Sequence, residues 1–372
     1  MKILIFSNSF WNLYNFRSSI IHKLKNNNKI ILVAKKDIYY NKFTNINNIR
    51  LKKLNFSSKS RSIFSNIFIF FNFFFILKKE NPDLLITFTI KPNIFGSIAS
   101  GILDIKTINN ITGLGSAFLK KNYFLLLIKC LFKFSFKKSK IVFFHNSLEK
   151  KIFISSAIVK KKQAKIINGS GINLKNYKKR IFSRDKITNK FVFSGRMISD
   201  KGIYELIEAI KIVKQKYNYT SFSIFGLLNQ DNAGAISKKT IQLWIDRGYI
   251  NFYPNVKKVN EHLSNFDCFI MPSYSEGMSR SLLEAASSGL PILCSDIPGC
   301  REIVKSNVNG FLFKPKNIRT LSNAIVKFIH LSVQKRILFG KQSRYIIQNN
   351  FTDEKVTKNY INHINEILKK NK

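Results

Sequence analysis

Two segments in the second half of the chain carry residues suited to holding a phosphorylated ligand. In the first, Gly195 and Arg196 follow a short apolar run, and Lys201 comes five residues after Arg196. A guanidinium offers a fork of donors and an ammonium a mobile point charge, so the pair can clamp a diphosphate. On its own, this loop would be interpreted as a solvated basic turn, and its meaning depends on the second segment.

The second segment, 271–285, places two carboxylates and a glycine between a predicted strand and a predicted helix. Gly277 allows a ligand to approach the backbone, and the helix start presents N–H groups to an anion at the positive end of its dipole. These N–H groups belong to Met278, Ser279 and Arg280. Glu284 could accept hydrogen bonds from ribose hydroxyls, or it could complete a capping box with Ser281.

Short apolar strands alternate with amphipathic helices along the whole chain, a pattern that predicts parallel sheets built from βαβ units. The predicted strands of the first half are 2–6, 29–34, 84–88, 106–110, 141–144 and 164–168. Those of the second half are 191–194, 221–225, 267–271 and 291–294. Ligands of such sheets bind beyond the carboxyl ends of the strands, where both candidate loops lie.

The length of 372 residues fits two domains better than one. The stretch 174–189 is polar and lacks either periodicity, which predicts a boundary there. We therefore expect Rossmann-like domains over 1–175 and 176–350. We expect a C-terminal helix over 351–372 that returns to the first domain.

The chain resembles the retaining GT-B glycosyltransferases of family 4 in three features. They are the spacing of Glu276 and Glu284, the segment 285–291 that follows them, and the earlier pairs Gly195-Arg196 and Lys201-Gly202. Further segments, 82–96, 112–115 and 296–302, are similar to a bacterial subgroup of that family. This subgroup adds sugars to polyprenyl-diphosphate-linked oligosaccharides. The resemblance covers most of the chain and implies the GT-B fold of two facing Rossmann-like domains.

The resemblance implies a role for each site residue. Arg196 and Lys201 would neutralise the donor diphosphate, Glu276 would contact the donor sugar near its reacting carbon, and the first domain would bind the acceptor. The other donor-binding residues would be Gly113, Gly115, Gly195, Gly277, Met278, Ser279, Arg280 and Glu284. Arg17 and Lys91 would bind the acceptor.

The implied donor is a nucleotide sugar, UDP-linked in this subgroup, and the implied acceptor is a polyprenyl-diphosphate-linked glycan. The implied location is the cytoplasmic face of the cell membrane, with peripheral attachment to its anionic surface. No D-x-D triplet occurs in the sequence, so we expect no metal ion and no cofactor. No nucleic-acid partner is expected.

The chain departs from the family at two places in its first half. Thr112 stands where many members have a His before the Gly-x-Gly-like loop, and His145, the histidine nearest to it, is interpreted as structural. Segment 8–12 replaces the N-terminal glycine-rich loop of many relatives. No role of that His is therefore carried over to this protein.

Two apolar segments could meet a membrane. Segment 62–77 is rich in Phe but shorter than the roughly 20 residues of a spanning helix, so a buried or interfacial helix is favoured. Segment 123–140 carries Lys129, Lys133 and Lys137 beside several phenylalanines. That pattern fits a helix at an anionic lipid surface and, equally, a helix packed on the sheet with a solvated edge.

The net charge of +43 leaves other functions open. It would attract any polyanion, although a bias toward Lys, Asn, Ile and Phe across the chain accounts for part of it. A nucleic-acid-binding protein is the main alternative, but no known motif of that class is visible. A dinucleotide oxidoreductase lacks its G-x-G-x-x-G after the first strand. The four cysteines show no metal-ligand spacing and indicate reduced thiols.

Overall fold

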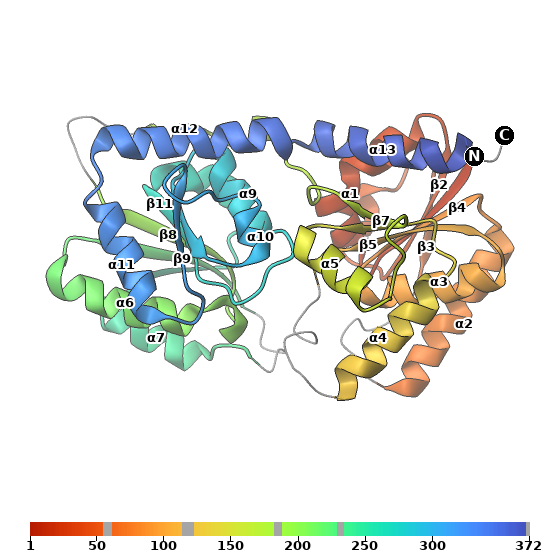
Figure 1. Ribbon diagram of the computed structural model, residues 1–372, viewed down its shortest axis with the longest axis horizontal. Helices are drawn as coiled ribbons and strands as arrows, with labels where there is room; N and C mark the ends of the chain where they lie inside the picture. The colour runs from red at the N-terminus through yellow and green to blue at the C-terminus, as the bar shows by residue number, and fades with distance from the viewer. Residues whose placement is uncertain (55–61, 114–122, 182–187, 229–233, 370–372) are drawn as a thin grey trace. The chain divides into compact units, whose positions relative to one another are not determined.

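The computed structural model describes residues 1–54, 62–113, 123–181, 188–228 and 234–369. The chain divides into two compact units. The first unit comprises Met1–Gly171 together with Asp353–Lys372, and the second comprises Ile172–Thr352. Each unit is built around its own parallel sheet (Figure 1).

The first unit contains a seven-stranded sheet in the order β3-β2-β1-β4-β5-β6-β7, and every paired strand is parallel to its neighbour. The strand order reverses between β1 and β4. The strands are β1 (Lys2–Phe6), β2 (Lys29–Ala34), β3 (Ile49–Lys53), β4 (Leu84–Phe88), β5 (Lys106–Ile111), β6 (Ile141–Phe144) and β7 (Ala164–Ile166).

Helices cover both faces of this sheet, which is why β1 and β4 consist mostly of apolar residues. On one face, Ile3 and Ile5 pack with α1 and α13; on the other, Leu4 and Phe6 pack with α2. The helices of the first unit are α1 (Phe10–Lys25), α2 (Ile63–Glu80), α3 (Ile90–Ile102), α4 (Tyr123–Phe136), α5 (Ser147–Ser155) and α13 (Asp353–Lys369).

The C-terminal helix α13 packs on the first unit, as the sequence predicted. It lies beside α1, and its residues Val356, Tyr360 and Ile364 join the core under β1, β4 and β6. The buried Asn110 amide at the end of β5 donates a hydrogen bond of 2.9 Å to the Tyr360 hydroxyl. A buried polar contact fixes the register of a helix more strictly than apolar packing does, so this bond sets where α13 sits along the sheet.

The second unit contains a six-stranded parallel sheet in the order β10-β9-β8-β11-β12-β13. Its strands are β8 (Lys190–Arg196), β9 (Ser221–Leu227), β10 (Asn251–Pro254), β11 (Cys268–Met271), β12 (Ile292–Ser295) and β13 (Gly310–Phe313). Its helices are α6 (Ile203–Lys216), α7 (Lys238–Asp246), α8 (Val259–His262), α9 (Arg280–Ser287), α10 (Pro298–Arg301), α11 (Ile318–Ile329) and α12 (Val333–Asn350).

The predicted parallel α/β architecture with two sheets is confirmed, but three strands were missed. They are β3, β10 and β13, and each lies at the edge of its sheet. An edge strand buries only part of its length and tolerates charged residues, as Arg50, Lys52 and Lys53 of β3 illustrate. β3 and β10 carry charged or polar residues within the run on which the prediction depended, and β13 is apolar but only four residues long.

His145 lies directly after β6, and 95% of its surface is buried. Burial, with a smaller contribution from the positive charge of Arg17, lowers the pKa of this histidine to about 3. The imidazole is therefore neutral in the folded protein at neutral pH. Its burial agrees with the structural role predicted for it.

The buried His145 should make the first unit less stable in acid. Between about pH 6.5 and pH 3, this histidine is protonated in the unfolded chain but not in the folded protein. The free energy of unfolding therefore falls by about 1.4 kcal/mol for each pH unit by which the pH is lowered. We predict that His145→Gln removes this part of the acid sensitivity, whatever its effect at pH 7. Urea unfolding can be followed through Trp11, the single tryptophan of the first unit, in a Trp244→Phe background.

An exposed histidine of the second unit, His330, supplies the control. His330→Gln should leave the acid sensitivity of the first unit unchanged. Parallel losses of stability in His145→Gln and the parent protein between pH 6.5 and 4.5 would contradict the assignment.

Candidate active site

The first candidate loop of the second unit begins at the carboxyl end of β8. Gly195 and Arg196 are the last residues of that strand, and the Arg196 side chain is exposed. The chain then makes a short 3₁₀ turn, Ser199–Lys201, and enters α6 through Gly202, which has a φ of +69°. Arg196 and Lys201 therefore lie at the same strand end, before the same helix.

The second candidate loop connects β11 to α9. Ser279 is the N-cap of α9, and its hydroxyl accepts a hydrogen bond of 3.4 Å from the Leu282 N–H. This excludes the alternative capping box centred on Ser281. The helix begins at Arg280, so its opening amides are those of Arg280 and Ser281, and the prediction that Met278 and Ser279 supply them was wrong. An anion bound there would meet the positive end of the helix dipole.

The two loops lie side by side because β8 and β11 are neighbours in the sheet, although they are far apart in sequence. The strand order of the second unit reverses between these strands, and such a reversal is where doubly wound sheets bind ligands. The Tyr274 N–H donates 3.0 Å to the Asp200 carbonyl oxygen, which joins the loops through their backbones. The Lys201 ammonium lies 2.5 Å from a Glu276 carboxylate oxygen.

Gly202 allows this close approach. A Cβ on Gly202 would collide with the carbonyl oxygen of Pro272, directly after β11. Its φ is also one that L-residues with side chains rarely adopt. The first loop can therefore pack against the second only when residue 202 is glycine.

Gly299 supports the second loop from another side. It lies in α10, and a Cβ there would collide with the carbonyl oxygen of Glu276 and lie 2.6 Å from that of Gly277. Gly299 lies in a segment that resembles the family, but its packing role was not predicted. The contact joins α10 to the loop before α9, and sequence spacing does not reveal such a contact.

Glu284 is held in position by two donors. The Arg280 Nε lies 3.2 Å from Glu284 Oε1, and the Tyr177 hydroxyl donates to the same oxygen at 3.3 Å. Burial, and then the Glu284 charge, raise the pKa of Tyr177, so its hydroxyl keeps its proton and acts as a donor. Glu284 is 21% exposed and can still accept from a ligand. Sequence reasoning missed Tyr177, which stands 107 residues away and in no motif.

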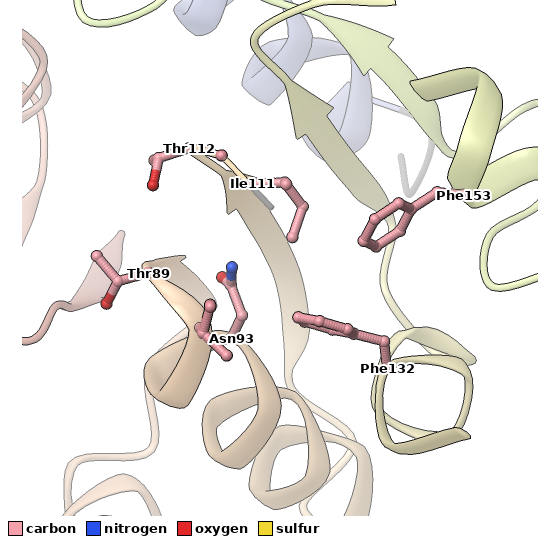
Figure 2. Close-up of a pocket in the computed structure, with 8 residues that line it drawn as sticks. Thr89, Asn93, Ile111, Thr112, Phe132 and Phe153 are labelled. Atoms are coloured by element: carbon pink, nitrogen blue, oxygen red, sulfur yellow. The ribbon is translucent and has the colours of Figure 1, made fainter. Parts of the chain in front are cut away.

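In the first unit, a small pocket lies where β5 ends and α3 begins. Its lining includes Thr89, Thr112 and Gly113, and Figure 2 shows Thr89 and Asn93 on one side with Ile111 and Thr112 on the other. Thr89 has a φ of +76°, and its buried hydroxyl has no partner among the residues described. Backbone strain of this kind gathers at functional sites. Gly115 lies outside the described residues.

The two predicted acceptor residues follow the strands that flank the reversal of the first sheet, β1 and β4. Arg17 of α1 is buried, and its guanidinium lies 4.3 Å from the centre of the Phe88 ring. Lys91 stands in the first turn of α3 and donates 2.9 Å to the side-chain oxygen of Asn66 in α2. Burial lowers the pKa of Lys91. Their contact with an acceptor stays a prediction.

Within the described ranges, no group of three or more His, Cys, Asp or Glu side chains is arranged to hold a metal ion. Arg196 and Lys201 bring positive charge to the strand reversal of the second sheet. All four cysteines are free thiols, and Cys130 is the exposed one.

Comparison with known protein families identifies both halves of the chain. Residues 175–350 match the family model described as glycosyl transferases group 1, and residues 2–146 match glycosyl transferase 4-like. The chain belongs to the GT-B glycosyltransferases of family 4. The alternative of a basic nucleic-acid-binding protein is not supported.

Individual relatives resemble this glycosyltransferase over most of its length. It is 28% identical to the N,N'-diacetylbacillosaminyl-diphospho-undecaprenol alpha-1,3-N-acetylgalactosaminyltransferase of Campylobacter jejuni, over 87% of this chain and 88% of that one. It is also 28% identical to the UDP-Gal:alpha-D-GlcNAc-diphosphoundecaprenol alpha-1,3-galactosyltransferase of Escherichia coli, over 74% and 73% of the two chains.

A solved structure confirms the fold. Anabaena HepE in complex with UDP-glucose has a TM-score of 0.77 at 18% identity, covering 98% of this chain and all of that one. Likeness at this identity supports the fold alone, so the donor and acceptor of this protein require a separate argument.

The contact between the two loops generates a prediction about Gly202. We expect Gly202→Ala to weaken binding of UDP at least about 10-fold, because the new methyl group forces the first loop away from Pro272 and separates Lys201 from Glu276. The left-handed backbone adds a stability cost of about 1–2 kcal/mol. Calorimetric titration with UDP and urea unfolding measure the two effects.

Gly248→Ala is the matched control. Gly248 has a φ of +67°, but a Cβ there would meet nothing within 4 Å. It should therefore show the same backbone cost with normal UDP binding. Equal UDP binding by the two variants would show that the packing of the loops does not shape the site.

Proposed function

We propose that the protein transfers a sugar, a hexose or an N-acetylhexosamine, from a UDP-linked donor to a polyprenyl-diphosphate-linked glycan. The transfer retains the anomeric configuration and needs no metal ion. The observation that carries the proposal is the convergence of Arg196, Lys201, Glu276 and the start of α9 at the strand reversal of the second sheet. The names of the two curated relatives support the acceptor class.

The donor diphosphate lies between the two loops of the second unit. Arg196 and Lys201 supply positive charge on one side, and the amides at the start of α9 supply it on the other. Gly195 and Gly277 let the phosphates approach the backbone, and Met278, Ser279 and Arg280 line the helix start. Glu284, fixed by Tyr177 and Arg280, accepts hydrogen bonds from the ribose hydroxyls.

Catalysis is electrostatic. As the bond between the anomeric carbon and the phosphate oxygen breaks, negative charge grows on the departing UDP, where fixed cations and helix amides stabilise it. The acceptor hydroxyl forms the new bond on the same face and gives its proton to the departing phosphate. Glu276 positions Lys201 and contacts the sugar near the reacting carbon.

The first unit binds the acceptor. Gly113 and Gly115 stay predicted donor-binding residues, and Arg17 and Lys91 bind the acceptor diphosphate. A lipid-linked acceptor places the enzyme at the inner face of the cell membrane, attached peripherally to its anionic surface. None of the helices in the described part of the chain is long and apolar enough to cross a bilayer.

Donor binding can be tested by thermal stability. UDP at 100 times its dissociation constant should stabilise the protein by about 2.7 kcal/mol. In Arg196→Ala the dissociation constant should rise about 10- to 100-fold, as expected for the loss of a charged hydrogen bond. The stabilisation at the same UDP concentration should then fall to between about 1.4 and 0.4 kcal/mol. Arg247→Ala, at an exposed arginine that follows α7, is the control. Full stabilisation of Arg196→Ala by UDP would remove Arg196 from the diphosphate site.

The chemistry can be tested with a set of UDP-sugars and a polyprenyl-diphosphate glycan. UDP release should continue at an unchanged rate in excess EDTA, because protein side chains neutralise the diphosphate. Proton NMR of the product should show an α-linked sugar from an α-configured donor. A product of inverted configuration, or a loss of activity in EDTA that magnesium restores, would contradict the corresponding part of the proposal.

A further inference from the structure

Helix α2 of the first unit is apolar on both of its faces. Its inner face packs on the sheet through Ile69, Phe73 and Leu77, which are fully buried. Its outer face carries four phenylalanines at spacings of four, three and four residues, and each is between 51% and 86% exposed. They are Phe64, Phe68, Phe71 and Phe75. A helix that covers a sheet needs only one apolar face, so the outer face requires a second explanation.

The neighbouring helices continue this surface. α2 contacts α3 and α3 contacts α4, so the three helices form one layer over the same side of the sheet (Figure 1). On α4, Leu127, Leu131 and Phe134 repeat at helical spacing and are also exposed, while Phe132 and Phe136 of the same helix are buried. The outer surface of the layer is therefore apolar along both α2 and α4.

The exposed charges of α2 and α4 are of one sign. Lys78 and Lys79 end α2, and Lys133 and Lys137 lie exposed on or just after α4. The one acidic side chain in the two helices, Glu80, is buried and lies 3.1 Å from Lys52. The surface thus combines exposed aromatic rings with lysines and presents no carboxylate from either helix.

We propose that this outer surface of α2 and α4 docks on an anionic lipid bilayer, with the phenylalanines and leucines below the headgroups and the lysines at the level of the phosphates. The proposal rests on the lipid-linked acceptor of the proposed function and assigns the surface that meets the membrane. Apolar rings with basic neighbours are the composition that binds such interfaces. A second copy of the chain is disfavoured as the occupant, because a symmetric contact would bring lysines against lysines.

The position of α2 connects this surface to the candidate acceptor site. Asn66, in the first turn of α2, accepts the hydrogen bond from Lys91 at the start of α3. Phe64 and Phe68 flank Asn66 in sequence, so the amino end of the phenylalanine row adjoins the predicted acceptor cation. An acceptor diphosphate anchored at the bilayer surface therefore meets Lys91 where α2 meets the membrane.

Co-sedimentation with phosphatidylcholine vesicles, with and without phosphatidylglycerol, tests the proposal on the full chain. We expect binding that requires phosphatidylglycerol and weakens with salt. A variant with Phe64, Phe68, Phe71 and Phe75 changed to Gln should bind about 100-fold more weakly or worse. The control changes four exposed apolar residues of the second unit to Gln and should bind normally. These residues are Tyr219, Leu243, Leu338 and Tyr345.

A second pair of measurements separates this proposal from the proposed function. The four-Gln variant of α2 should keep the stabilisation by UDP of the parent protein, and its KM for a long-chain acceptor in vesicles should rise while kcat changes little. If the parent protein binds UDP normally but does not bind anionic vesicles, the assignment of the membrane surface is overturned and the proposed donor site is unaffected. Light scattering that finds a dimer in the parent protein and a monomer in the variant would assign the surface to a second copy instead.

Discussion

The contact of Gly202 with Pro272 is the constraint on which the candidate donor site depends. It lets the loop after β8 lie against the loop after β11, and so brings a lysine and a glutamate that are 75 residues apart to within hydrogen-bonding distance. Gly299 likewise lets the backbone of α10 pack closely against the second loop, at Glu276 and Gly277. Two glycines thus fix the loop conformation through backbone packing, which leaves the side chains of the site available for the ligand.

The ion pair between Lys201 and Glu276 has a clear electrostatic meaning. Both side chains are mostly buried, at 15% and 12% exposure, and a buried charge needs a partner. The carboxylate beside it holds the ammonium in place. In the proposed mechanism this arrangement is preorganised, so little reorientation is needed when charge develops on the leaving group. Glu284 is preorganised in the same way, because Tyr177 and Arg280 fix its position.

The sequence was informative wherever function and fold depend on local spacing. Periodicity predicted the parallel sheets and the helix after β8. Motif order predicted that four residues group beyond strand ends: Arg196, Lys201, Glu276 and Glu284. Tyr177 and the packing role of Gly299 could not be predicted, because each depends on contacts between distant segments. The edge strand β13 was missed because it is only four residues long. The outer face of α2 shows a related limit: the apolar composition was visible, but the sequence could not say which phenylalanines face the core.

A crystal structure of the protein with a bound UDP-sugar tests the central claim most directly. The account predicts the diphosphate between Arg196 and the start of α9, with Lys201 in contact with it and the ribose hydroxyls within hydrogen-bonding distance of Glu284. A nucleotide bound elsewhere in the second unit, or a ribose that does not contact Glu284, would contradict it.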